Sequence, residues 1–266
     1  MRASVLRRGL RDGRRAFVWW AIGILGYVVL IAAVWPTVRD NPALKKLHET
    51  YPQALKAFVS FGGEVDFSTA AGYLGAELFS LVVPLLLMIA AIGSGARAIA
   101  GEEEAGTLDL LLANPISRTR LAFEKLAVVI VEMLFLAGVL WLALWASARI
   151  FDMEISGVHL LAAVASAALL AVAFGAIATA IGAGTGRRVV AISTCAALAL
   201  ASYLINALAP LVSAINRIRW LSPWYHYAGA DPLRHGIDVG HAGVLVVIIV
   251  VATIALPLAF ERRDLR

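Results

Sequence analysis

Charged residues are scarce in this sequence. Asp, Glu, Lys and Arg make up 15% of its 266 residues, whereas hydrophobic residues make up 61%. Soluble domains carry about 25% charged and roughly 45–50% apolar residues. A soluble domain of this size could not bury so much apolar surface. The composition therefore excludes an ordinary soluble domain and indicates that lipid is the solvent for much of the chain.

Cysteine and the common catalytic motifs are also missing. The sole cysteine, Cys195, lies in an apolar run, so no internal disulfide can form and a buried side chain is favoured over a reactive thiol. The sequence contains no G-x-x-x-x-G-K-[ST] phosphate loop, His-Glu-x-x-His or Cys-x-x-Cys motif. His226, His235 and His241 match no metal-binding spacing. We therefore predict that the chain is not an enzyme on its own and holds no cofactor or metal.

Six long apolar runs contain few or no charges. Each is long enough for the roughly 20 residues with which a helix crosses the bilayer, and none alternates as barrel strands do. The sequence predicts an all-α, polytopic membrane protein with a single transmembrane domain over residues 1–266. The predicted spans are 16–38, 71–96, 126–148, 158–186, 189–216 and 239–260.

The distribution of basic residues predicts an orientation. With six spans, both termini lie on one side, together with the segments 97–125 and 187–188, and this side holds 15 of the 23 Lys and Arg residues. The positive-inside rule then predicts cytoplasmic termini in a bacterial cell membrane. No basic stripe interleaved with aromatics occurs in a polar segment, so the pI near 9.7 does not indicate a nucleic-acid partner.

The segments at the membrane surface have recognisable patterns. Residues 1–15 combine helically spaced Leu6, Leu10 and Gly13 with six arginines, which predicts an amphipathic helix in the headgroup layer, a frayed arginine tail being the alternative. The opposite segment, 217–238, is rich in aromatics and prolines, which fits the outer interface and allows a partly re-entrant loop. Small residues in spans four and five indicate close packing, either within the chain or between subunits.

The most informative segment connects spans two and three. Glu102, Glu103 and Glu104 are expected at the start of a short helix, near the positive end of its dipole. A leucine stripe would follow on one face, Pro115 would end the helix, and Ser117 would cap the next one. Such a helix could dock on a partner and move both spans, or its leucines could simply lie in lipid.

This segment resembles the signature of ABC-2 type transporter permeases, in particular the NosY-like branch of six-span subunits. The pattern is a set of acidic residues, Gly-Thr-Leu, two further leucines, Pro-x-Ser-Arg and a downstream lysine. The matching positions are Glu102, Glu103, Glu104, Gly106, Thr107, Leu108, Leu111, Leu112, Pro115, Ser117, Arg118 and Lys125.

The resemblance implies a dimer, made with a second copy or a similar permease, carried by two separate ABC ATPase subunits. The partner ATPase would bind ATP and Mg, and segment 102–118 would be the coupling helix seated in it. ABC-2 relatives export varied substrates. The apolar bundle by itself favours a hydrophobic or amphipathic substrate.

Two carboxylates fall inside predicted spans. Such groups are costly in lipid and are functional candidates by default. Glu132 could pair with Arg97 as a gate, whereas Glu77 lies close enough to the outer surface to reach water. Two other classes of function remain open: a secondary transporter or channel that needs no ATPase, which would favour charges deep in several spans, and a membrane anchor or scaffold.

Overall fold

The computed structural model describes residues 5–41, 66–107, 117–229 and 231–261, and every regular element in these ranges is a helix. Six helical stretches are long and apolar enough to cross a membrane, which confirms the predicted all-α, six-span class. The elements are α1 (Val5–Arg39), α4 (Ala70–Leu74), η1 (Gly75–Phe79), α5 (Val82–Ala96), η2 (Arg97–Gly101), α6 (Glu102–Glu104), α8 (Arg118–Ile150), α9 (Gly157–Thr185), α10 (Arg188–Leu208), α11 (Ser213–Ile218), η3 (Arg219–Leu221), α12 (Pro223–Ala228), α13 (Pro232–His235) and α14 (Val239–Glu261).

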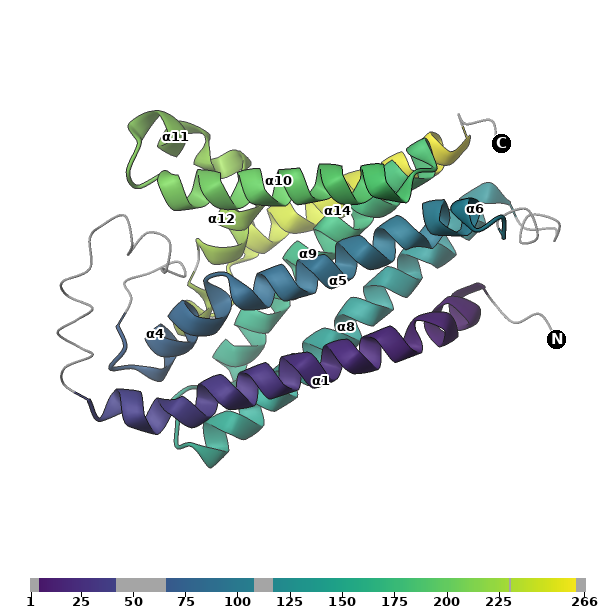
Figure 1. Ribbon diagram of the computed structural model, residues 1–266. Coiled ribbons are helices and arrows are strands. Elements are labelled where there is room, and N and C mark those ends of the chain that lie inside the picture. Colours follow the sequence, from purple (N-terminus) through teal and green to yellow (C-terminus); the bar gives the residue numbers. More distant parts are fainter. Residues whose placement is uncertain (1–4, 42–65, 108–116, 230, 262–266) are drawn as a thin grey trace.

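The two ends of the bundle differ in what they carry. Figure 1 shows that α1 begins and α14 ends at the same end, where α6 also lies. We call this the termini end. The opposite end carries α4, α11 and α12 and is called the loop end. The segment between spans two and three therefore starts beside the chain ends, as an even number of spans requires.

The helices of spans four and six, Gly157–Thr185 and Val239–Glu261, lie within one residue of the predicted limits. Those of spans one, two and three, Leu6–Arg39, Ala70–Glu104 and Arg118–Ile150, extend several residues beyond the predicted limits at the termini end, and that of span five is shorter. Span five was expected to reach residue 216, but α10 ends at Leu208. Pro210 has no backbone N–H and cannot continue the hydrogen-bond ladder, so the chain turns and resumes as α11. The apolar character of residues 209–216 thus reflects a surface turn rather than a longer span.

The first helix unites two predicted elements. α1 runs for 35 residues without interruption, about 52 Å at 1.5 Å per residue. The basic segment from Val5 to Arg15 is therefore the first part of the helix that forms span one. Within the described residues no break separates a surface helix from the span.

α9 lies at the centre of the bundle. It contacts α5, α8, α10 and α14. In its most apolar stretch 78% of the residues are buried, against 22% in the corresponding stretches of α1, α10 and α14. Its small residues allow this position, because a Cβ at Gly95 of α5 would lie 2.3 Å from the carbonyl oxygen of Gly175. A Cβ at Gly175 would in turn lie 2.9 Å from Val129. Gly175 therefore serves packing within the chain.

Span two is broken near its loop end. The helix stops after the π-helical turn η1, and α5 begins at Val82. Pro84 causes the break, since its ring would clash with the carbonyl of Ser80 and it donates no hydrogen bond. The hydroxyl of Tyr227 donates to the carbonyl oxygen of Phe79 at 2.7 Å, which satisfies a backbone acceptor at the break.

Segment 217–238 folds into the bundle rather than over it. Trp224 and Tyr227 of α12 are almost fully buried, and α12 packs against α9, α10 and α14. Ser222 caps α12 and shares a hydrogen bond of 2.9 Å with Ser202 of α10. α12 is therefore packed among the spans, whereas Trp220 is exposed, and a partly re-entrant course of this segment stays a possibility.

Candidate functional site: the polar cavity at the termini end

The three glutamates of the connecting segment close a helix instead of opening one. They form α6, the last turn of span two, so the expected placement at a helix start was wrong. The backbone N–H of Thr107 bonds the carbonyl of Glu102, and that of Gly106 bonds Glu103. With Gly106 at φ +67°, this is a Schellman ending, in which glycine is favoured because it has no Cβ. The Gly-Thr pair of the motif thus has a structural role in ending span two.

An ion pair joins the two ends of the connecting segment. The ammonium group of Lys125, in α8, contacts the carboxylate of Glu102 at the end of span two. Lys125 is 5% exposed, so it requires a partner in this apolar setting. Spans two and three are therefore linked to each other at the base of the segment between them.

Two further carboxylates bind the starts of other spans. Glu104 accepts a hydrogen bond of 2.8 Å from the backbone N–H of Arg188, the first residue of α10. Glu124 accepts one of 3.4 Å from the N–H of Leu6 in the first turn of α1. Both sit where a helix presents unpaired N–H groups and a partial positive charge. Acidic residues thus tie spans one, three and five to the exit of span two.

The remaining residues of the predicted coupling helix divide into two groups. Ser117 caps α8 by accepting from the N–H of Arg120, as predicted, and Arg118 lies over the ring of Phe260 in α14. Leu108, Leu111, Leu112 and Pro115 lie outside the described residues. The course of the leucine stripe therefore stays a prediction.

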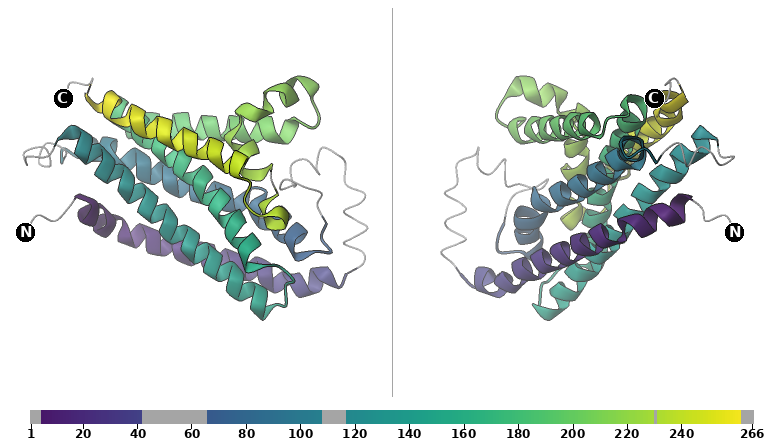
Figure 2. Two further views of the ribbon diagram at one scale, coloured as in Figure 1. Left: turned by 180° about the vertical axis from the view of Figure 1, so that it is seen from behind. Right: turned by 45° about the vertical axis from the view of Figure 1, so that its right-hand side comes forward.

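α1 and α8 run side by side in the same direction (Figures 1 and 2). Two glycines of α1 face α8: a Cβ at Gly9 would lie 2.8 Å from Val128, and one at Gly13 would lie 2.6 Å from Oε1 of Glu132. The four-residue spacing on both helices sets the register of this parallel pair. The glycines bring the backbone of α1 directly against a carboxylate of α8.

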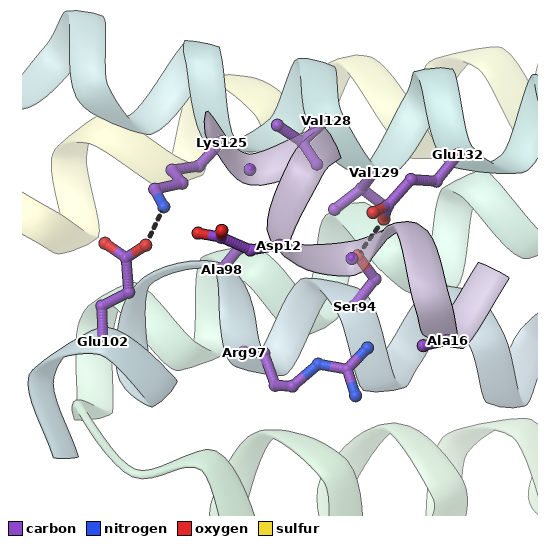
Figure 3. A pocket seen from close by; sticks show the side chains of 12 residues that line it. Asp12, Ala16, Ser94, Arg97, Ala98, Glu102, Lys125, Val128, Val129 and Glu132 are labelled. Atoms are coloured by element: carbon purple, nitrogen blue, oxygen red, sulfur yellow. Dashed lines mark hydrogen bonds and ion pairs between the residues drawn. The ribbon is translucent and has the colours of Figure 1, made fainter. Parts of the chain in front are cut away.

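A cavity of about 330 Å³ lies beside this contact, between α1, α8 and the end of span two. In the view of Figure 3, Asp12 lies between the Glu102–Lys125 pair and the side chain of Glu132. The cavity is lined by Gly9, Asp12, Gly13, Ala16, Ser94, Arg97, Ala98, Glu102, Lys125, Val128, Val129 and Glu132. It is a charged chamber at the termini end of an otherwise apolar bundle.

Glu132 has one hydrogen-bond partner in this chamber. It is 5% exposed, and the hydroxyl of Ser94 donates to its Oε2. Arg97 lines the same cavity but is exposed, and it makes no ion pair within 4.0 Å among the residues that the structure describes. The two members of the predicted gate thus share one cavity without touching in this conformation.

An apolar groove lies on the other side of the same carboxylate. Its volume is about 310 Å³, and its lining residues are Leu10, Arg14, Phe17, Val18, Val131, Glu132 and Phe135. Val18, Val131 and Phe135 are 40–50% exposed, so the groove opens toward the surroundings of the bundle. Glu132 belongs to the wall of both spaces.

A second polar cluster lies at the loop end. Nε2 of His226 lies 2.7 Å from the carbonyl oxygen of Trp220 and must donate to it, so Nδ1 of neutral His226 accepts. Nδ1 of His241 lies 3.1 Å from Nδ1 of His226 and therefore donates to it. Burial lowers the pKa of His226. The pair connects α12 to the first turn of α14.

Sequence reasoning found Glu132, Arg97 and Glu102 but missed the residues that assemble the cavity. Ser94 resembles any small polar residue in a span, and nothing local relates it to Glu132. Gly9 and Gly13 did carry a signal, because glycines four apart in a helix allow close approach of a neighbour. Because of the surrounding arginines, this segment was predicted to lie at the membrane surface instead.

Six helices of bilayer-spanning length and composition around a small-residue core are typical of a multi-pass membrane protein. A family model described as "ABC-2 family transporter protein" matches residues 3–265, and the chain belongs to that family. Members are the non-catalytic membrane component of transporters that work with ABC ATPases. A comparison with the curated proteins gives no match.

Proposed function

We propose that this chain is the permease subunit of an ATP-driven exporter. Two copies, or one copy and a similar permease, form the pathway, and two separate ATPase subunits bind ATP and Mg. The termini end faces the cytoplasm of a bacterial cell, where segment 102–118 docks on an ATPase. The family match and the lack of a phosphate loop support this division of labour.

The observation that carries the proposal is the link at the base of the segment. Because Glu102 and Lys125 bind each other, the exit of span two and the start of span three form one unit. A displacement of the segment by closing ATPases would then tilt both spans together instead of separating them. Glu104 would pass the same motion to α10 through its bond to Arg188.

The cavity supports a role for Glu132 and Arg97 in switching access. We propose that tilting of span two brings Arg97 onto the free oxygen of Glu132, which closes the chamber on the termini side. The two groups line one cavity, and the long arginine side chain is not held by another acid within the described ranges. Loss of this pair is expected to leave the ATPase active but poorly coupled to export.

The docking assignment is tested by co-purification. Leu111→Arg, in the leucine stripe, is expected to abolish association with the ATPase while the permease still inserts. Leu221→Arg is the control, because Leu221 is 58% exposed and lies in η3, between α11 and α12 of the loop end. Normal recovery of the ATPase with Leu111→Arg would refute the docking role of this segment.

Transport by the chain alone would favour the secondary-transporter class instead. Liposomes containing only this permease are expected to show no uptake or efflux until ATPase subunits and ATP are added.

A further inference from the structure

The cavity at the termini end lacks hydrogen-bond donors for its carboxylates. Oε2 of Glu102 is buried and has no partner, although Lys125 binds the other oxygen. Oε1 of Glu132 makes no hydrogen bond with any described residue. A buried acceptor without a donor, such as Oε2 of Glu102, is costly, so this wall of the cavity is incomplete as it stands.

The carboxylates of the cavity differ in their ion pairs. Lys125 binds Glu102, and Asp12 lies 3.7 Å from Arg8 of its own helix. Glu132 makes no ion pair within 4.0 Å with any described residue, although Arg97 lines the same cavity and Arg14 lines the groove beside it. A ligand that complements this site carries a positive charge and several N–H donors.

The apolar lining of the groove beside the cavity indicates that the rest of the ligand is apolar. It is almost wholly apolar apart from Arg14 and Glu132, and it opens outward from the bundle along α1 and α8. Glu132 is the residue that the lining of the groove shares with the lining of the cavity. An apolar chain in the groove would place its polar head at Glu132.

We propose that this site binds an amphiphile with a primary ammonium head, the head in the cavity against Glu132 and the apolar chain in the groove between α1 and α8. An ammonium group supplies a positive charge and three N–H donors for the oxygen of Glu132 that makes no hydrogen bond, and the carboxylate of Asp12 lines the same cavity. The inference rests on the proposed export function and names its substrate class. Arg97 would then replace the head at Glu132 when the gate closes.

The test measures binding of dansylcadaverine, a primary ammonium joined to an apolar fluorophore, to the full chain in phosphatidylcholine nanodiscs. Dodecylamine is expected to displace it at least ten times more effectively than dodecanol, which has the same chain without the charge. Glu132→Gln is expected to lower dodecylamine affinity at least tenfold. Glu77→Gln is the matched control, since Glu77 lies in span two near the loop end and lines neither space.

Two further measurements identify the source of the ligand and keep the test valid if one variant misfolds. Competition by phosphatidylethanolamine in the nanodisc, but not by soluble phosphoethanolamine, would identify the bilayer as the source; the reverse result would identify a water-soluble amine. Asp12→Asn alters an exposed residue and is expected to weaken binding about threefold even if Glu132→Gln does not fold.

Equal displacement by dodecylamine and dodecanol, or unchanged affinity in both the Glu132→Gln and Asp12→Asn variants, would overturn the proposal. Neither result would affect co-purification of the ATPase, so failure of the ligand assignment is distinguishable from failure of the proposed permease function.

Discussion

The two ends of the bundle are held together by different chemistry. At the termini end, charged side chains make the links: Glu102 with Lys125, Glu104 with the N–H of Arg188, and Glu124 with that of Leu6. At the loop end, buried aromatics and neutral hydrogen bonds make most of the links, as between Tyr227 and the break in span two, beside a contact of 3.5 Å from Arg39 to the carbonyl oxygen of Asp152. Long charged side chains can exchange partners over several ångströms, whereas a buried ring has one position. We infer that the loop end is the fixed end and that the termini end rearranges.

Removing one partner of the Lys125–Glu102 pair is expected to have the largest effect. Lys125→Met leaves the carboxylate of Glu102 partly buried and unpaired. The expected loss of stability is about 2–4 kcal/mol, somewhat below the range for a fully buried pair because Glu102 retains some solvent contact. Thermal unfolding in detergent measures it. The double variant Lys125→Met with Glu102→Gln should recover most of the loss, and a failure to recover would show that Lys125 acts through other contacts.

The matching change at the loop end is Tyr227→Phe. It removes a single hydroxyl and leaves the carbonyl of Phe79 without this donor, at an expected cost of about 1–3 kcal/mol. Tyr225→Phe is the control, because the same atom is removed from a less buried ring of the same helix. Equal stability of the two variants would contradict the role of Tyr227 as an anchor of the break in span two.

A smaller effect is expected where α1 meets α8. A Gly→Ala change inside a helix normally stabilises it by up to about 1 kcal/mol. In Gly13→Ala the new Cβ would lie 2.6 Å from Oε1 of Glu132, so the carboxylate must move and this gain is lost. Gly23→Ala in the same helix has open space and should stabilise the protein by that amount. The difference between the two melting temperatures measures the contact. If both variants gain equally, the packing of Gly13 against Glu132 is refuted.

The smallest expected effect is a pH dependence at the loop end. Because burial lowers the pKa of His226 below its unfolded value near 6.5, the unfolded chain binds more protons in this range. The stability that neutral His226 contributes is therefore fully present above pH 6.5. It is lost as the pH falls from there through the lowered pKa. His226→Gln should flatten the stability profile between pH 7.5 and 5, while His235→Gln, at an exposed position, should not. A slope unchanged by His226→Gln would assign the pH response to other groups.

The spans could be predicted because exclusion of charge from lipid is a local property of the sequence. The limits of α14 follow from where charged residues stop and resume, at Asp238 and Glu261. The start of the connecting segment was misassigned for an equally local reason. The acidic run was interpreted as a helix start, although Gly106, two residues beyond it, is the stronger signal and ends the helix.

The polar cavity could not be predicted because its contacts join residues far apart in the chain. Ser94 and Glu132 are 38 positions apart, and Tyr227 reaches a carbonyl 148 positions away. Pro84 predicts a break in span two but not which side chain fills it. Charge and periodicity thus specify the helices, whereas the site depends on their register.

The lone cysteine offers a practical opportunity. Cys195 is fully buried in α10, with its sulfur 4.0 Å from the carbonyl oxygen of Phe174. A maleimide that cannot cross membranes will therefore leave the natural protein unlabelled. Thiols introduced singly by Arg187→Cys and Trp220→Cys, at exposed positions on opposite ends, would then report directly which compartment each end faces.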